Sequence, residues 1–551
     1  CSFDALGQSA QVASGANERD GCEPPLVFAF DVRGAKAIAD VPAPKSIEPG
    51  AMQSLLRWNR IAIDASGLDH TPVPPGEARV FGEQLGPARA SRAMAIVHLA
   101  MYDAHAGAVN NSITLPRYLS PPISQAVGTA SPAAAVAAAA HACLTKLYPR
   151  QKAHFDAAHA GSQLVGSGIP QGHAFGLAVA QAILADRKDD PSASDDGYAA
   201  SVYPDAHRQD PDNPTQGFHA PFYGAGSKCF AVTVRHGLDS PSTLSATEHD
   251  NALKQVRGKG IAPELMGTLP ATYKKRTVDE TVVGLYWAYD GPRELGTPPR
   301  LYNQIVREVA NTALNPGTGV INTVDDNARL FALVNAAMGD AGILAWEQKY
   351  IHDFWRPVLG IREHDPSMGP AAPTPKDNID NDCDPEWLPL GAPASNSHVA
   401  ATDDKPERSD RNFTPPFPAY PSGHATFGAA AFHTVRLFYG VPAGNRAADT
   451  VYTGPFVSDE LNGITRDNKG SIRPRHLRKF DDGLWQMIEE NGLSRVWLGV
   501  HWSFDAFALK PGPGAPKPDL SRNIGGVPLG LNIAENVFAA GGGIAPVKST
   551  V

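Results

Sequence analysis

The same helical pattern occurs twice in this sequence, 237 residues apart. Residues 92–104 place apolar side chains at steps of three and four, which puts them on one face of an α-helix. Residues 329–341 repeat the pattern, and seven of the thirteen positions are identical. Two alanine-rich helices can match by chance. Because each copy lies near the start of one half, an ancient duplication is favoured, and we predict a mainly α chain of two related helical bundles, one of them catalytic.

Outside this pattern, the sequence predicts further helices joined by long ordered connections. They are expected near residues 131–147, 170–187, 245–256, 276–289, 299–313, 424–439 and 481–497. Strand-like alternation is scarce, with a short candidate near residues 228–235. Residues 362–416 and 440–480 are expected to be loops that form walls or lids, because loops of this length in compact proteins are usually functional. Residues 1–50 show little periodicity, and we expect helices from about Gly86 onward.

The composition fits a large soluble globular protein. Its 551 residues, 42% hydrophobic and 19% charged, allow one very large core or two fused cores. We assign residues 1–270 to a structural half with the first bundle and residues 271–551 to a catalytic half with the second, packed as one compact unit. The net charge of −9 and the pI of about 6.1 disfavour nucleic acid as a partner. No uncharged 18-residue stretch is hydrophobic enough for a transmembrane helix.

The five cysteines give no metal-binding pattern. They show no CxxC spacing, which disfavours a zinc or iron–sulfur site. Cys1 and Cys22 can pair in an oxidising compartment, and unpaired residues without chemistry are an equally good interpretation. The sequence starts at Cys1 rather than Met, as after leader removal from a bacterial lipoprotein, although trimming explains this equally well. We expect a secreted, periplasmic or cell-envelope protein.

The first of three motifs that we interpret together contains two cations. Four residues recur at three- and four-residue steps, which predicts one helical stripe: Trp346, Lys349, Asp353 and Arg356. Lys349 and Arg356 would then lie two turns, roughly 10 Å, apart, and both long side chains can reach one anion. Pro357 disfavours further helix, which predicts that the Arg356 guanidinium lies at the helix end. An exposed charged stripe is the ordinary alternative for this motif alone.

The second motif, Pro-Ser-Gly-His at residues 421–424, has the pattern of a helix start. A helix start directs free N–H groups and the positive end of the helix dipole toward a bound group. Ser422 adds a hydroxyl, and Gly423 lets the backbone approach an oxyanion because it lacks a side chain. His424 is placed to exchange a proton beside bound oxygens. An ordinary N-cap before a core helix is the commoner use of such a sequence.

The third motif contains Arg495 and His501. These residues are six apart, so an unbroken helix would place them on different faces, and Gly499 offers a break. A metal-bound or nucleophilic imidazole needs one free nitrogen while an acceptor holds the other N–H. Asp505 and a backbone carbonyl are equal candidates for that acceptor. A satisfied structural histidine is the alternative for His501 alone.

Together the three motifs predict a site for a compact tetrahedral oxyanion such as phosphate or vanadate. Lys349, Arg356 and Arg495 nearly neutralise a trianion, and each arginine presents a planar fork that suits tetrahedral oxygens. The helix start at Ser422 completes this set of oxyanion-binding residues, which we call the cradle. His501 supplies the one atom able to bond covalently to the central atom.

With these motifs the chain resembles the superfamily of vanadium-dependent haloperoxidases and type 2 (PAP2-like) acid phosphatases. The spacings of 63 residues between Pro357 and Pro421, and of 69 between His424 and Ser494, are longer than in typical phosphatases and are similar to the haloperoxidase branch. Finer similarity points to the vanadium chloroperoxidases of filamentous fungi and their bacterial relatives. This similarity is strong over residues 280–540 and weak before them. It rests on stretches such as 287–291, 296–300, 413–424, 458–463 and 525–530.

The resemblance implies two four-helix bundles and a role for each motif residue. The vanadate oxygens would be hydrogen-bonded by cationic and helix-start residues: Lys349, Arg356, Ser422, Gly423 and Arg495. His501 would be the one protein ligand of the vanadium. His424 would be the acid–base group. Asp290 would pair with Arg495 and fix its orientation.

Two more residues resemble those of the fungal chloroperoxidases. Phe417 stands five residues before Ser422, where algal bromoperoxidases have His. Trp346, three residues before Lys349, also follows the chloroperoxidase pattern. Together they would form the apolar wall at which halide binds, and a desolvated chloride ion is the better nucleophile.

The resemblance therefore predicts an enzyme with a vanadate cofactor that uses hydrogen peroxide to oxidise chloride and bromide to hypohalous acid, which halogenates small organic acceptors. His424 would take peroxide protons and Lys349 would polarise the bound peroxide, while the pentavalent vanadium acts as a Lewis acid. An acid phosphatase with His501 as nucleophile is the alternative, because the same cradle serves both reactions. A third possibility is a binding protein that sequesters oxyanions and does not need His424 as an acid–base group.

Overall fold

We describe the fold from a computed structural model of the chain. The structure describes residues 50–551 apart from residues 72, 74–75, 125–129, 163, 193, 291–294, 366, 372–381, 397–411 and 511–516. The predictions for the first 49 residues, the pairing of Cys1 with Cys22 among them, lie outside this part of the chain.

The described chain is mainly α-helical, as predicted, and its named strands form one small antiparallel pair. The α-helices are α2 (Ala51–Asp69), α3 (Gly86–Val109), α4 (Pro132–Leu147), α5 (Lys152–Ala160), α6 (Ile169–Asp186), α7 (Tyr223–Gly226), α8 (Ala246–Lys259), α9 (Val278–Tyr286), α10 (Pro298–Thr312), α11 (Val324–His352), α12 (Pro357–Arg362), α13 (Gly423–Phe438), α14 (Gly483–Trp497) and α15 (Gly526–Ala540). The strands are β1 (Ala508–Lys510) and β2 (Lys517–Asp519).

The helices expected outside the repeated pattern are all present, as α4, α6, α8, α9, α10, α13 and α14. The expectation that helices begin only near Gly86 is wrong, since α2 precedes it. The buried residues Leu55, Trp58, Ile61, Ala62 and Ala65 of α2 follow helical spacing. The signal for this helix is therefore present in the sequence.

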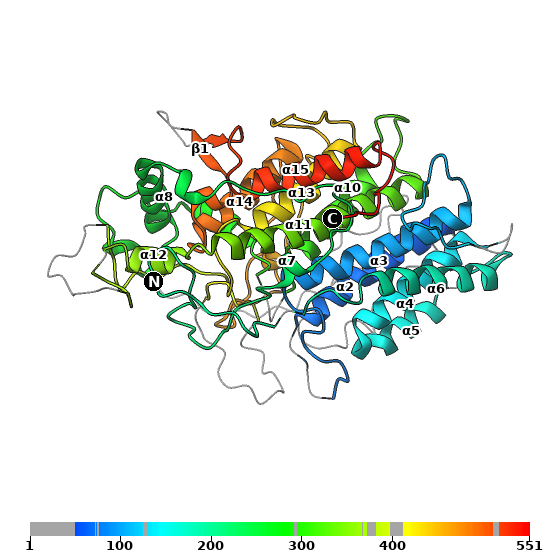
Figure 1. Ribbon diagram of the computed structural model, residues 1–551, viewed down its shortest axis with the longest axis horizontal. Helices are drawn as coiled ribbons and strands as arrows, with labels where there is room; N and C mark the ends of the chain where they lie inside the picture. Colours follow the sequence, from blue (N-terminus) through cyan, green and yellow to red (C-terminus); the bar gives the residue numbers. More distant parts are fainter. Residues whose placement is uncertain are drawn as a thin grey trace, which may run out of the picture.

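The two copies of the repeated pattern, α3 and α11, pack against each other in the middle of the molecule (Figure 1). Helices α2, α4 and α6 pack around α3, whereas α13 and α15 pack against α11. One continuous hydrophobic core runs through both groups of helices, from Leu55 to Ala545. The two bundles therefore share a core, and the predicted boundary at residue 270 stays a prediction.

The repeated pattern places an aspartate at the same point of α3 and α11, and both carboxylates bind backbone N–H groups. Asp103 accepts from the N–H of Tyr118 at 2.7 Å. Asp340 accepts from three successive N–H groups of residues 230–232. These N–H groups are therefore satisfied by a carboxylate instead of a neighbouring strand, which is why the strand expected at residues 228–235 is wrong.

A second correspondence between the two halves involves the residue five positions before each aspartate. His98 of α3 lies 2.9 Å from Asn59 of α2, and its other nitrogen contacts the carbonyl one turn earlier. Asn335 of α11 makes the same two contacts, to Asn303 of α10 and to the carbonyl one turn earlier. The pairs α2–α3 and α10–α11 are thus equivalent, which supports the duplication inferred from the sequence.

Helix α11 ends earlier than the sequence predicts. It stops at His352, and Asp353 adopts a left-handed conformation with φ of 46°. Pro357 starts α12 instead of ending a helix, as its fixed φ and missing N–H favour. Lys349 and Arg356 therefore do not share one helical stripe, and a short non-helical segment that begins at the left-handed Asp353 separates them.

Of the described helices, α11 alone is long and apolar enough to cross a membrane, and 94% of its most apolar window is buried inside the molecule. A helix that is buried to this extent is a core helix of the fold. The described cysteines Cys143, Cys229 and Cys383 are buried and form no disulfide with one another.

The three hydrogen bonds to Asp340 predict a specific loss of stability. Asp340→Asn turns one acceptor oxygen into an N–H₂ donor that faces backbone donors. We expect the free energy of unfolding to fall by about 3 kcal/mol, measured by urea unfolding followed by circular dichroism. The exposed Asp481→Asn variant is the control and should differ from the wild type by less than about 0.5 kcal/mol. An Asp340→Asn protein as stable as the wild type would contradict the capping role.

Candidate active site

The three sequence motifs meet in one buried place at the ends of α11, α13 and α14. Lys349 Nζ donates to the carbonyl of Pro421 at 2.5 Å. The N–H of Ser422 donates to the carbonyl of Asp505 at 2.8 Å. Arg356 Nη1 lies 2.9 Å from His501 Nε2. The structure thus brings together the residues that the sequence predicts to converge.

Lys349 is fully buried in the last turn of α11. Its Nζ donates to the carbonyls of Pro418, Ala419 and Pro421 at 2.7, 3.2 and 2.5 Å, which occupies all of its hydrogens. Burial, and then repulsion by the Arg356 guanidinium, lower the pKa of Lys349 well below its ordinary value. An anion bound here would compete with these carbonyls and would favour the charged ammonium.

Arg356 lies at the N-cap of α12 and is also fully buried. Its Nε donates to the carbonyl of Phe417 at 2.9 Å, and its Nη1 donates to the carbonyl of Val500 at 2.7 Å. Nη2 is buried without a hydrogen-bond partner among the described residues. Burial lowers the pKa of Arg356 to about 9.

Arg495, on α14, is held by Asp290 through two hydrogen bonds of 2.7 and 2.6 Å. This is the bidentate geometry that fixes a guanidinium plane, and it is the contact that the family resemblance implies. The Nε of Arg495 is buried and has no partner in the described part of the chain. Burial raises the pKa of the Asp290 carboxyl, and the Arg495 guanidinium opposes this rise.

Helix α13 begins at Gly423 with Ser422 as its N-cap, as the sequence predicts. Ser422 Oγ accepts from the N–H of Ala425 at 3.3 Å. A Cβ added to Gly423 would lie 3.4 Å from the Trp346 ring and 3.9 Å from Cε of Lys349. The positive end of α13 therefore lies directly against the buried cations.

His424 is held in a neutral form. Its Nε2 lies 2.5 Å from the carbonyl of Ala288, an acceptor that requires the proton on Nε2 and leaves Nδ1 as the free base. Its own carbonyl accepts from Asn491 at 2.6 Å and from Tyr302 at 3.2 Å. Burial and the Arg495 guanidinium lower the pKa of His424 well below its usual value, so at neutral pH it can accept a proton.

His501 has the arrangement expected of a ligand or nucleophile. The chain breaks at Gly499, which has a φ of 74°, and His501 follows the break, as predicted. Nδ1 lies 2.8 Å from the Asp505 carboxylate. Of the two predicted acceptors, Asp505 and a backbone carbonyl, the acceptor is therefore Asp505. Nε2 faces the Arg356 donor, so its lone pair is unprotonated. Burial raises the pKa of Asp505 to about 7.

The site has an excess of positive charge. Three buried cations, Lys349, Arg356 and Arg495, stand against two buried carboxylates, Asp290 and Asp505. Two guanidinium nitrogens of this site, Arg356 Nη2 and Arg495 Nε, have no acceptor among the described residues. Burying a charge is costly unless it is paired, so this cluster is electrostatically incomplete and complements an oxyanion.

The two predicted wall residues lie beside the cations. The Trp346 and Phe417 ring centroids are 4.8 Å apart. Lys349 Nζ and Arg356 Cζ each lie 5.0 Å from the Phe417 ring centroid. A third ring, His219, lies 6.0 Å from Trp346 and 6.2 Å from Phe417. Sequence reasoning did not find it.

His219 and the also unpredicted His207 belong to a segment of the first half that runs along the site. The N–H of His207 donates to the carbonyl of Asp353, and the N–H of His219 donates to the carbonyl of Pro416. His207 is buried, and neither ring nitrogen has a partner among the described residues. No spacing or periodicity in the sequence signals these contacts, because they depend on tertiary pairing.

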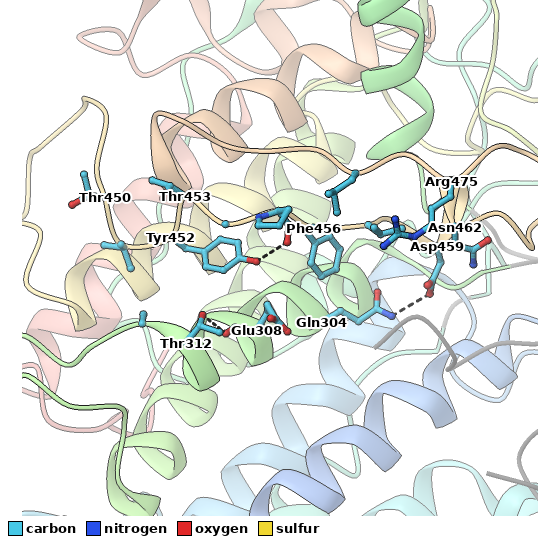
Figure 2. Close-up of a pocket in the computed structure, with 16 residues that line it drawn as sticks. Gln304, Glu308, Thr312, Thr450, Tyr452, Thr453, Phe456, Asp459, Asn462 and Arg475 are labelled. Carbon is cyan, nitrogen blue, oxygen red and sulfur yellow. Dashed lines mark hydrogen bonds between the residues drawn. The ribbon is translucent and has the colours of Figure 1, made fainter. Parts of the chain in front are cut away.

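A pocket of about 470 Å³ lies next to this site, between α10 and the loop that follows α13. Figure 2 shows Tyr452 and Phe456 of the loop on one side, and Glu308 and Gln304 of α10 on the other. None of the predicted site residues lines it. The backbone N–H of Asp459, a residue of the pocket wall, donates to the hydroxyl of Tyr289 at 3.0 Å. Tyr289 directly precedes Asp290. The loop of residues 440–480 therefore forms one wall of this pocket.

The fold and the site define a helical-bundle protein with a buried cationic site for a tetrahedral oxyanion. A family model described as the vanadium chloroperoxidase N-terminal domain matches residues 44–229, and one described as the second helical-bundle domain matches residues 329–510. The vanadium chloroperoxidase of Curvularia inaequalis is 33% identical over 92% of this chain and 93% of its own length. The chain therefore belongs to the vanadium chloroperoxidase family, a family of oxidoreductases.

The match of the N-terminal domain shows that the similarity also covers the first half, where the sequence motifs are thin. Two solved structures share the fold. A bacterial vanadium-dependent iodoperoxidase has a TM-score of 0.55 at 18% identity and covers 90% of this chain and 97% of its own. A bacterial vanadium-dependent chloroperoxidase, in its holo form, has a TM-score of 0.52 at 14% identity and covers 86% and 94%.

The lowered pKa of Lys349 predicts that anion binding is coupled to proton uptake. Tungstate is a tetrahedral dianion that does not titrate near neutral pH, and its charge should raise the Lys349 pKa on binding. Protons are then taken up, so the Kd should increase by up to about tenfold per pH unit as the pH rises through the range between the free and bound pKa values. Calorimetry in two buffers of different protonation enthalpy, repeated at rising pH from neutral into the alkaline range, measures the uptake.

The control for this measurement is Lys349→Met, which removes the titrating group and should bind tungstate more weakly with less proton uptake. Proton release by the wild type, or an uptake that the variant retains in full, would contradict the assignment.

Proposed function

We propose that the protein is a vanadate-dependent haloperoxidase that uses hydrogen peroxide to oxidise chloride and bromide to hypohalous acid, which then halogenates small organic acceptors. The observation that carries this proposal is the buried excess of positive charge around the unprotonated Nε2 of His501, in a chain of the vanadium chloroperoxidase family. The named activity of the Curvularia relative supports the choice of substrate.

The residues present fit a vanadate ion. Vanadate oxygens need N–H donors, and Arg356 Nη2 and Arg495 Nε are buried donors without described acceptors. Vanadium needs one basic nitrogen, and Asp505 fixes the His501 tautomer that leaves Nε2 unprotonated; the Arg356 donor that now contacts Nε2 would have to turn to an oxygen of the ion. Lys349, Ser422 and Gly423 would complete the set of oxygen contacts. When bound, vanadate supplies a Lewis acid that makes peroxide electrophilic without a change of oxidation state.

His424 would remove a proton from hydrogen peroxide. Its neutral ring carries a free base at Nδ1, because Nε2 is held by the Ala288 carbonyl. Once protonated, the ring is positively charged. The carboxylate of Asp290, 3.9 Å from Nε2, would then stabilise that charge.

Trp346 and Phe417 would bind the halide. Trp346 is fully buried and Phe417 half-buried, so they exclude water from one side of the site. The positive ring edges of aromatic residues attract anions, and Lys349 beside both rings adds a full positive charge. A chloride ion that has lost part of its hydration is a stronger nucleophile toward the activated peroxide.

A phosphatase remains the alternative on the same residues. His501, with Asp505 behind it, could attack phosphorus, and the cations would hold the phosphoryl oxygens. Family membership favours the oxidation of halide. Hydrolysis of p-nitrophenyl phosphate without vanadate does not separate the two, whereas a rate that needs vanadate, peroxide and halide together does.

The direct test is reconstitution. The protein incubated with orthovanadate should halogenate monochlorodimedone in the presence of hydrogen peroxide and bromide or chloride, followed by the loss of its absorbance. His501→Ala should lower this rate by at least about 100-fold, because loss of the covalent ligand removes the bound Lewis acid. The exposed His173→Ala variant is the control and should keep the full rate. A wild-type protein that binds vanadate but halogenates nothing would refute the proposal.

The proposed role of His424 predicts a difference between halides. His424→Ala should slow chlorination more than bromination, because chloride is harder to oxidise and demands more of the activated peroxide. We expect a loss of about 100-fold for chloride and about tenfold for bromide, in the range of general acid–base contributions. Vanadate affinity, measured by titration, serves as the control for the intact cradle. Unchanged turnover with both halides would show that His424 has no catalytic role.

A further inference from the structure

We propose that His219 is a halide-specificity residue, whose imidazole completes the wall of Trp346 and Phe417 and donates an N–H hydrogen bond to the halide. The inference rests on the proposed haloperoxidase function. It assigns to the first half of the chain a residue that acts on the substrate.

The position of His219 is fixed by its backbone. Its carbonyl accepts from Trp346 Nε1 at 3.2 Å and from the Tyr350 hydroxyl at 2.9 Å. Its N–H donates to the carbonyl of Pro416 at 2.7 Å, the residue before Phe417. Three hydrogen bonds therefore tie His219 to the residues that form or flank the wall.

The ring of His219 adds an edge to the wall. It meets the Trp346 ring at an angle of 87° with centroids 6.0 Å apart, and the Phe417 ring at 55° with centroids 6.2 Å apart. Trp346 and Phe417 offer only carbon edges toward a small anion beside them. An imidazole in the same wall offers an N–H, which binds an anion more strongly than a ring edge does.

The surroundings of Nε2 favour a hydrogen on the other ring nitrogen, Nδ1. Nε2 is buried without a partner among the described residues. It lies close to the backbone of α3, since a Cβ added to Gly86 would be only 2.4 Å from it. A hydrogen on Nε2 would therefore be a buried donor without an acceptor, which is unfavourable. Burial, together with nearby His70 and Arg89, lowers the pKa of His219 to about 4. The ring is thus neutral at physiological pH and carries one N–H.

The wall also lies on the accessible side of the site. Lys349, Arg356 and Arg495 are fully buried, whereas Phe417 and His219 are half-buried. A halide that enters from solvent therefore reaches these two rings before the cations. Chloride holds water more tightly than bromide, so a replacement hydrogen bond counts more for chloride.

The substitution His219→Phe tests the proposal, because it keeps an aromatic ring and removes the N–H. In the vanadate-loaded enzyme, the KM for chloride should rise about tenfold, as expected for loss of a hydrogen bond to a charged group. The KM for bromide should rise less. The KM for peroxide and the affinity for vanadate should stay within about twofold of the wild type.

Two further variants separate the N–H from general packing. His219→Gln keeps a side-chain donor and should restore most of the chloride affinity. His141→Phe is the matched control, since His141 packs edge-on against Trp58 at 6.2 Å and 79°, in the same geometry but on α4. It should leave both halide KM values unchanged.

A second measurement does not depend on turnover or on a stable variant. Anomalous diffraction from crystals of the vanadate-loaded protein soaked in bromide should place a bromide ion within hydrogen-bond distance of His219 and against the two rings. A bromide ion elsewhere in the site, or a chloride KM of His219→Phe equal to the wild type, would overturn the inference and leave the proposed function intact. A wild-type protein that oxidises no halide would overturn both.

Discussion

The burial of three cations in one place is the constraint on which the site depends. Lys349, Arg356 and Arg495 have no access to solvent, and charges that are buried together are costly unless other groups compensate them. Two carboxylates and a set of backbone carbonyls supply part of that compensation. The remainder calls for an anion. The same imbalance that strains the free protein therefore provides the binding energy for a tetrahedral oxyanion.

The scaffold holds these cations on elements that are packed against and hydrogen-bonded to one another. Lys349 lies on α11, which packs against α3 through the two copies of the repeated pattern, and Asp340 of α11 anchors the N–H groups of residues 230–232. Ser422 is tied by its N–H to Asp505, so the second and third motifs share a hydrogen bond. Preorganisation of this kind keeps the cations together although they repel one another.

The sequence was sufficient for the helices and for the residues of the cradle, because both depend on local patterns. The start of α13 at Gly423 and the break at Gly499 follow from residue types at fixed positions. The end of α11 was predicted wrongly, since the left-handed Asp353 has no marker such as glycine. His207 and His219 could not be predicted, because they reach the site through backbone pairing with residues more than 100 positions away.

The two imidazoles of the site differ in the acceptor that holds them, and this difference supports the roles that we propose for them. His501 is backed by the carboxylate of Asp505, which increases the electron density at the opposite nitrogen and favours a lasting bond to an electrophilic centre. His424 is backed by the neutral carbonyl of Ala288, which fixes the tautomer without adding a charge. A weaker base releases its proton more readily. The first ring is therefore suited to hold the cofactor, and the second to carry a proton to and from the substrate.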